Sequence, residues 1–288
     1  MIKTKMIVVL FLIGGMIACV TAPKEPLTTP KAAVRDSHEG LNGVLWVQTA
    51  AEYQTLARVA FSLAKSALDN ALQDKSWTAA LEQTGSGDYS SKNEAIIVDI
   101  DETILDNSPY QARLVKERST FNKDLWKLWT EKHIAAPVPG ADDFLKYANS
   151  RGVTVFYITN RDTSEEADTR RNLSDLNLPI RADLDVVLTK NENNWTSSDK
   201  SQRRAKVCED FRVLLLIGDD LGDFVSGAKD SPQKRVQLAQ KYNSYWGVKW
   251  ILIPNPLYGS WESALYGNDY NLSDKDILDK KLNQLKDF

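Results

Sequence analysis

The chain has 288 residues, of which 42% are hydrophobic and 26% charged, with only 10 Pro and 14 Gly. This composition is that of an ordered water-soluble domain, and it excludes disordered, collagen-like and multi-span membrane proteins. The net charge of -3 provides no basic field to hold a nucleic-acid polymer. Two cysteines and two histidines are too few for a disulfide framework or a histidine-based site, so any catalysis uses mainly carboxylates, lysine and hydroxyls.

The first segment has the features of an export signal. Two early lysines precede an uncharged apolar stretch over residues 6–18, which is too short to span a bilayer. We therefore expect residues 1–18 to be a signal peptide. The sequence MIAC, which ends at Cys19, is similar to a bacterial lipobox, where the cysteine thiol receives the lipid anchor. The alternative is an ordinary signal peptide in which Cys19 is incidental.

The predicted anchor fixes the expected domain organisation. Residues 19–40, which contain three prolines among Thr and Lys, are expected to form a lipidated flexible tether. Residues 41–288 then form the folded domain. The protein is expected to be exported and held by the lipid on Cys19, at the outer membrane or in the periplasm.

The folded part is expected to be an α/β protein. Apolar residues recur at helical spacing and predict a long helix over 52–72 that covers one face of the core. They are Leu56, Val59, Ala60, Leu63, Ala67 and Ala71. Unalternated apolar runs are typical of strands buried on both faces, and helix-like stretches separate them. These patterns predict a three-layer sandwich with a central parallel sheet and a small cap inserted around 107–137. The predicted strands are 95–98, 153–158, 186–188, 213–217 and 250–253.

Polar residues follow three of these strands. Asp99 and Asp101 follow the first strand, and Thr159, Asn160 and Arg161 follow the second. The fourth strand ends in Gly218-Asp219-Asp220-Leu221-Gly222-Asp223. Ligands of open parallel sheets bind beyond the carboxyl ends of the strands, so these side chains are the candidate site.

The candidate site favours a hard cation. Two aspartates so close together repel each other, and a divalent ion is the simplest way to keep both ionised. Oxygen ligands without histidine suit Mg²⁺, and the combination of carboxylates, metal and hydrogen-bond donors suits phosphoryl transfer. The alternative for each aspartate is a helix cap or turn after a strand. For the lysine of the site, Lys200 is favoured over Lys190, which also follows a strand-like run.

The order of these motifs resembles the haloacid dehalogenase superfamily. More closely, the strings 99–110, 139–141, 157–161, 199–201 and 254–259 are similar to class C acid phosphatases, the lipoprotein e(P4) group of 5'-nucleotidases. The similarity runs from the 52–72 helix to about Tyr258. It implies a haloacid dehalogenase-like Rossmannoid fold with a small helical cap, and a phosphatase domain over 41–288.

The resemblance also implies roles for the site residues. Asp99 would be the nucleophile that carries the aspartyl phosphate, and Asp101 would protonate the leaving alcohol, which requires it to start protonated. Mg²⁺ would be held by Asp99, the Asp101 backbone carbonyl and Asp219, with Asp223 ordering a metal-bound water. Phosphate oxygens would be held by Thr159, Asn160 and Lys200.

The implied substrate is a small phosphomonoester, most specifically a nucleoside 5'-monophosphate. Tyr258 would stack on the base, and Phe121 in the cap would supply the opposite face. One alternative is a broad acid phosphatase or phosphotransferase without nucleotide preference. Another is a surface lipoprotein that binds ligands without turnover. A homodimer is also left open.

Overall fold

The computed structural model describes residues 37–85 and 88–287. In this part of the chain five parallel strands form the central sheet in the order β5-β4-β1-β6-β7. All five predicted strands are present, and most of their side chains are buried on both faces, which explains the unalternated apolar sequences. Their bounds are β1 Asn93–Val98, β4 Thr154–Asp162, β5 Val187–Lys190, β6 Phe211–Gly218 and β7 Trp250–Leu252.

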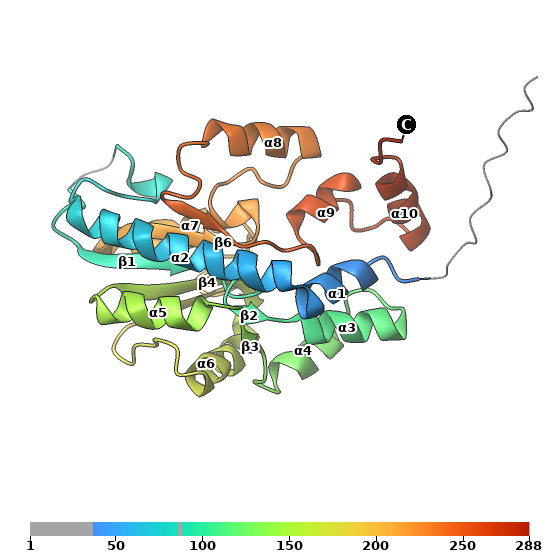
Figure 1. Ribbon diagram of the computed structural model, residues 1–288, viewed down its shortest axis with the longest axis horizontal. Coiled ribbons are helices and arrows are strands. Elements are labelled where there is room, and N and C mark those ends of the chain that lie inside the picture. Colours follow the sequence, from blue (N-terminus) through green and yellow to red (C-terminus); the bar gives the residue numbers. More distant parts are fainter. Residues whose placement is uncertain (1–36, 86–87, 288) are drawn as a thin grey trace, which may run out of the picture. The chain divides into compact units, whose positions relative to one another are not determined.

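Helices form the two outer layers. Helices α2 (Ala51–Gln73) and α5 (Ala141–Ser150) lie side by side across one face of the sheet (Figure 1). The chain runs outward from β1 to β4 and β5 and then returns across the sheet to β6. Right-handed connections therefore place α7 (Ser201–Asp210), which packs on β6 and β4, on the opposite face. The predicted three-layer α/β sandwich is confirmed. The other helices are α1 Leu41–Thr49, α3 Ser108–Glu117, α4 Lys123–Thr130, α6 Glu166–Asp175, α8 Pro232–Lys241, α9 Ser260–Leu265 and α10 Asp274–Leu282.

The face of α2 that meets the core agrees with the prediction at Ala67 and Ala71 but differs at the larger aliphatic residues. Leu56, Val59 and Leu63 are 48%, 56% and 44% exposed. The buried stripe instead contains several alanines together with Phe61, whose ring lies 5.8 Å from that of Phe144 on α5. Small side chains let the helix approach the sheet and α5 closely, so packing places the alanine stripe inward and the larger aliphatic stripe outward.

Strand β4 is longer than its apolar run. The run ends at Ile158, but after an irregularity in pairing Asp162 is again paired with Lys190 on β5. Residues 159–161 are therefore part of β4 and are not in a loop after it. Their backbone positions are fixed by the sheet, which matters because this segment holds candidate ligands for phosphate.

The segment expected to form the cap contains α3 and α4. It is enclosed by the short antiparallel pair of β2 (Leu105–Asp106) and β3 (Ala136–Pro137). At the start of α4 the side chain of Asn122 accepts a 2.8 Å hydrogen bond from the Leu125 N–H, which satisfies one of the free amides at that helix end. Both ends of the insertion thus return to one place beside the carboxyl end of β1.

The predicted signal peptide, Cys19 and the tether up to residue 36 lie outside the described residues. Among the helices of the described part, none combines the length and the apolar content needed to cross a bilayer.

Candidate active site

Three carboxylates meet at the carboxyl edge of the sheet. One oxygen from each of Asp99, Asp219 and Asp223 lies within 4.8 Å of the others. Asp99 directly follows β1, and the two other aspartates follow β6, 120 residues further along the chain. The sheet brings these residues together because β1 and β6 are neighbours in parallel register. The structure thus brings together three of the four residues that were predicted to hold the metal.

The backbone around the cluster is adapted to it. The Asp99 N–H donates a 2.9 Å hydrogen bond to the Ile217 carbonyl, so the ladder between β1 and β6 continues up to the aspartate. A Cβ atom on Gly218 would lie 2.2 Å from Asp223 Oδ2, so only glycine leaves room for that carboxylate. The Asp223 Oδ2 atom in turn accepts a 2.9 Å hydrogen bond from the Asp220 N–H.

Asp220 forms hydrogen bonds within its own loop and with the start of α9. It caps the short 3₁₀ turn Leu221–Asp223 by accepting a 2.8 Å hydrogen bond from the Gly222 N–H. Its carboxylate also accepts hydrogen bonds from the Ser260 N–H at 2.7 Å and from the Ser260 hydroxyl at 2.6 Å. Asp220 thus ties the loop after β6 to the start of α9 and is not one of the three clustered carboxylates.

Lys200 is the lysine that reaches the cluster. Its Nζ contacts Asp99 Oδ1 and lies 2.6 Å from Asp223 Oδ1. The side chain is 4% exposed, so its charge is removed from water and is compensated by these two carboxylates. Lys190, the alternative, ends β5 and is paired with Asp162 in the strand register.

Burial makes the ionised cluster costly. It raises the pKa of Asp99 to about 7, and the Asp223 and Asp101 charges add to the effect, whereas Lys200 opposes it. Burial, together with repulsion from the Asp223 and Asp99 charges, holds the pKa of Asp219 well above its usual range. Asp219 nevertheless accepts 2.8 Å hydrogen bonds from the Thr103 hydroxyl and the Asn255 amide, which fix its orientation.

The donor set fits a hard divalent cation. Three carboxylates against one ammonium group leave two negative charges uncompensated when all are ionised, and a divalent ion would offset them. Asp99, Asp219 and Asp223 offer oxygen only, with no sulfur or imidazole in the group, and oxygen ligands of this kind suit Mg²⁺. The side chain of Asp101 is not part of the group.

Asp101 points to a different partner. Arg161 donates three hydrogen bonds to the Asp101 carboxylate. Its Nη2 lies 2.7 Å and its Nε 3.0 Å from Asp101 Oδ1, and its Nε lies 3.2 Å from Asp101 Oδ2. The Asn107 amide donates a further 2.9 Å bond. Arg161 also lies over the ring of Trp126 on the cap, with 5.4 Å between its guanidinium carbon and the ring centroid. One arginine therefore connects Asp101 with the cap.

Thr159 and Asn160, both predicted to hold phosphate, are consecutive residues of β4, and the Asn160 side chain is exposed. Thr159 is fully buried, and its hydroxyl accepts a 3.0 Å hydrogen bond from the Arg161 N–H. The side-chain amide of Asn160 donates a 3.1 Å bond to the Ser198 carbonyl. Arg203 holds both residues, because its guanidinium donates to the Thr159 carbonyl and, at 2.7 Å, to Asn160 Oδ1.

The two predicted base-binding aromatics lie in different surroundings. The Tyr258 hydroxyl donates to Glu102, a buried residue with a left-handed backbone (φ 59°). Phe121 is 66% exposed and lies beside the rings of Tyr110 and Trp126, at centroid distances of 6.3 and 6.4 Å. The described contacts do not pair Phe121 with Tyr258.

Sequence reasoning missed several residues that hold the site together. Glu102 and Asn107 were part of the string that carried the resemblance, but no role was assigned to either. No role was assigned to Arg203 and Arg204 either, although both are almost completely buried. A signal was available, because they follow Lys200 by three and four residues and therefore share its face of the helix.

Comparisons with known proteins agree with this geometry. A family model described as HAD superfamily, subfamily IIIB (acid phosphatase), matches residues 25–261. The chain belongs to this family. The structure of the class C acid phosphatase from Bacillus anthracis is 34% identical, with a TM-score of 0.76 over 86% of this chain and 97% of that chain. A second structure of that phosphatase, with tungstate bound, gives 33%, 0.75 and the same coverage.

The resemblance to class C acid phosphatases and the haloacid dehalogenase-like fold are thus confirmed. The family match spans most of the chain, so its coarse activity carries over: the protein is an acid phosphatase, which acts on small phosphate monoesters. The match includes β1, β4 and β6 with all of the clustered carboxylates.

The raised pKa values of the cluster predict a pH-dependent stability for the metal-free protein. Asp99 and Glu102 have folded-state pKa values of about 7 and about 8, above the ordinary values of 3.8 and 4.5. At a pH between the ordinary and the folded-state pKa of each group, the folded state binds a proton that the unfolded state has released. The free energy of unfolding is therefore highest in acid and falls as pH rises. With chelator present, the melting temperature should fall from about pH 5 to about pH 8. A melting temperature that rises over this range would contradict the explanation, and Asp99→Asn should flatten the slope.

Proposed function

We propose that this acid phosphatase is an exported, Mg²⁺-dependent enzyme that hydrolyses nucleoside 5'-monophosphates through an aspartyl phosphate on Asp99. The observation that carries the mechanism is the position of Asp99 at the end of β1, buried against Lys200 and within 4.8 Å of Asp219 and Asp223. A carboxylate that is fixed by the sheet and lies beside a positive charge is a suitable nucleophile for phosphorus. The positive charge of Lys200 reduces the repulsion between the Asp99 carboxylate and the negatively charged phosphate group.

In the first step an Asp99 oxygen attacks phosphorus and the bond from phosphorus to the ester oxygen breaks. Asp101 gives its proton to the departing alcohol, and the contact with Arg161 stabilises the carboxylate that is left. In the second step Asp101 takes a proton from water, whose oxygen attacks phosphorus and releases inorganic phosphate and the free Asp99 carboxylate. Phosphate oxygens are held by Lys200 and by the Thr159–Asn160 segment of β4.

Asp99, the Asp101 backbone carbonyl and Asp219 would hold Mg²⁺, with Asp223 as the outer partner. When bound, the ion supplies Lewis-acid stabilisation of the charge on the transferred phosphoryl group. The chain itself keeps the carboxylates in place: Thr103 and Asn255 orient Asp219, and Gly218 leaves room for Asp223.

Asp99→Asn should abolish turnover and leave the fold intact, because the amide has nearly the same shape but cannot attack phosphorus. The measurement is steady-state hydrolysis of AMP, nicotinamide mononucleotide and an aryl phosphate, with and without chelator. Wild type should lose activity with chelator and regain it with Mg²⁺. A variant as active as wild type would disprove the proposed mechanism.

The same assay separates the two alternatives. A broad acid phosphatase gives equal specificity constants for the nucleotides and the aryl phosphate, whereas a binding lipoprotein gives no turnover for any of them. A structure with beryllium fluoride and Mg²⁺ distinguishes the binding protein further, because the enzyme should form a mimic of phospho-aspartate on Asp99. The presence of both Asp99 and a positioned Asp101 supports the enzyme.

The nucleotide preference is proposed from the aromatic residues near the site. Phe121, Tyr110 and Trp126 form an aromatic group on the cap, and the Trp126 ring lies over the Arg161 guanidinium that holds Asp101. Tyr258, which follows β7, is fixed through its hydroxyl by Glu102, which is next to Asp101 in sequence. We propose that the base of the substrate stacks on Phe121 and Tyr258.

Phe121→Ala should therefore reduce the specificity constant for AMP more than that for the aryl phosphate. Loss of one stacking contact is worth about 1–3 kcal/mol, which corresponds to roughly 5- to 150-fold. Leu128→Ala is the matched control, because Leu128 is a similarly exposed apolar residue on α4 of the same cap (54% against 66%). Equal losses for both substrates would assign Phe121 to cap packing.

We also propose that the protein is exported and anchored through a lipid on Cys19, with residues 19–40 as the tether. The support is the apolar stretch over 6–18 and the following MIAC sequence. Cys19→Ser should release the enzyme from the membrane fraction and abolish incorporation of labelled palmitate, with specific activity unchanged because the catalytic cluster is in the folded domain. Continued palmitate labelling of the variant would refute the anchor.

A further inference from the structure

Three buried cations lie on the first turn of α7. Lys200 immediately precedes this helix, and Arg203 and Arg204 are three and four residues further on, so all three share one face. Their exposed fractions are 4%, 0% and 1%. Cations buried to this degree are rare unless they are paired, and each of these three contacts a different part of the site.

Lys200 contacts the carboxylates themselves. Arg203 instead contacts β4, where it donates to the Thr159 carbonyl and to Asn160 Oδ1. Burial lowers the pKa of Arg203 to about 10, and its Nε is buried without a hydrogen-bond partner. The protein therefore keeps a positive charge here despite the cost of taking it out of water, in a place where it fixes the segment assigned to phosphate.

Arg204 contacts the loop after β6. Its Nη1 donates a 3.0 Å hydrogen bond to the Asp223 carbonyl, next to the side chain that belongs to the carboxylate cluster. The other side of its guanidinium, through Nε and Nη2, forms 2.9 Å contacts with Glu82 Oε1. Arg204 thus connects the metal-binding loop to the 3₁₀ turn Leu81–Gln83.

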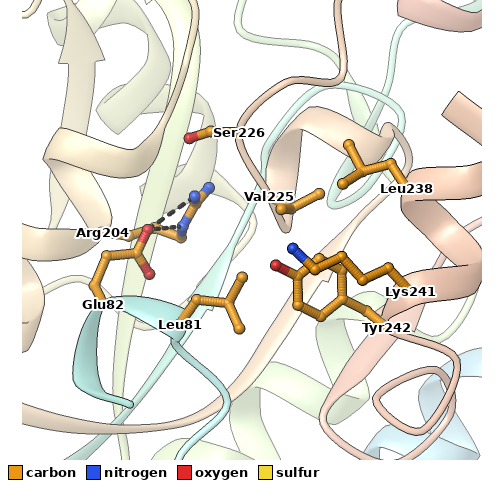
Figure 2. A pocket seen from close by; sticks show the side chains of 8 residues that line it. All are labelled: Leu81, Glu82, Arg204, Val225, Ser226, Leu238, Lys241 and Tyr242. Atoms are coloured by element: carbon orange, nitrogen blue, oxygen red, sulfur yellow. Dashed lines mark hydrogen bonds and ion pairs between the residues drawn. The ribbon is translucent and has the colours of Figure 1, made fainter. Parts of the chain in front are cut away.

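A cavity of about 390 Å³ lies beside this ion pair, between it and Lys241 and Tyr242 of the opposite wall (Figure 2). Arg204 itself is almost completely buried, and Glu82 lies with it in the wall of the cavity. Glu82 is the carboxylate that holds the guanidinium on the side away from the Asp223 carbonyl. A change at Glu82 should accordingly reach Asp223 through Arg204.

We infer that Arg203 and Arg204 are positioning residues that divide the site between them: Arg203 sets the phosphate-binding end of β4, and Arg204, held by Glu82, sets the metal-binding loop after β6. Neither contacts the reacting atoms. The inference rests on the proposed function, because it uses the phosphate and metal roles assigned there.

The test measures binding, not turnover. Mg²⁺ affinity is measured by calorimetry without phosphate, and affinity for inorganic phosphate is measured at saturating Mg²⁺. Arg204→Lys should weaken Mg²⁺ binding about tenfold, the lower end of the range for outer partners of metal ligands, and leave phosphate binding unchanged. Arg203→Lys should weaken phosphate binding to a similar degree, about tenfold, and leave Mg²⁺ binding unchanged. Lysine keeps the charge but cannot reproduce the forked contacts.

Arg212→Lys is the matched control. Arg212 is also fully buried and paired with a glutamate, Glu94 at 3.0 Å, but it is the second residue of β6, at the opposite end of the strand from the site. It should lower the melting temperature without changing either affinity. Glu82→Gln should weaken Mg²⁺ binding in the same direction as Arg204→Lys, by less, and it provides the measurement if an arginine variant does not fold.

The inference is overturned if Arg203→Lys and Arg204→Lys change both affinities equally, if Arg212→Lys changes them as much, or if Arg204→Lys or Glu82→Gln binds Mg²⁺ as tightly as wild type. Failure of the proposed function looks different. Wild-type protein that binds Mg²⁺ and phosphate but hydrolyses no nucleotide would remove the nucleotidase and leave the division between the two arginines intact.

Discussion

The site depends on keeping three acidic groups together in a buried space. Asp99, Asp219 and Asp223 repel one another, and burial adds to the cost of their charges, which is why the pKa values of Asp99 and Asp219 are raised. Lys200 offsets only part of this charge. Other features at this edge of the sheet support the arrangement. Gly218 leaves room for the Asp223 carboxylate, the Thr103 hydroxyl and the Asn255 amide orient Asp219, and the hydrogen bond to β6 fixes Asp99.

Helix α7 provides much of that support because of where the topology places it. The chain reaches it after β5, at one edge of the sheet, and must cross β4 and β1 to enter β6. Its first turn therefore passes the ends of all three strands that carry the site. A cation at each of three positions on one helical face can then reach a different strand end, which is what Lys200, Arg203 and Arg204 do.

Sequence alone predicted the sheet, its flanking helices and the convergence of the aspartates, because buried parallel strands have continuous apolar sequences and their carboxyl ends must share an edge. It was right about Ala67 and Ala71 on the buried face of α2 but wrong about the larger side chains. Hydrophobicity favours Leu56, Val59 and Leu63, but close helix packing favours alanine, and only the partner surface decides between them. It also ended β4 too early, since residues 159–161 are polar and yet belong to the strand.

The partners of the catalytic residues were harder to predict for a related reason. Buried arginines look like surface arginines in a sequence, and only the opposing carbonyls and carboxylates distinguish them. Asp101 was predicted from its spacing to Asp99, whereas its hydrogen bonds with Arg161 depend on a strand 60 residues further along the chain. Spacing identifies groups that can react, and the fold supplies the groups that orient them.

The contact of Arg161 with both Asp101 and Trp126 has a consequence for how such enzymes can diversify. An insertion between two strands is a convenient place to exchange whole segments between relatives, because its ends lie close together. Here the exchange would remove one neighbour of the arginine that holds Asp101. A transplanted cap without an aromatic ring at that place would change the surroundings of Arg161 and, through it, of Asp101, so exchange of the cap is coupled to the site by a single side chain.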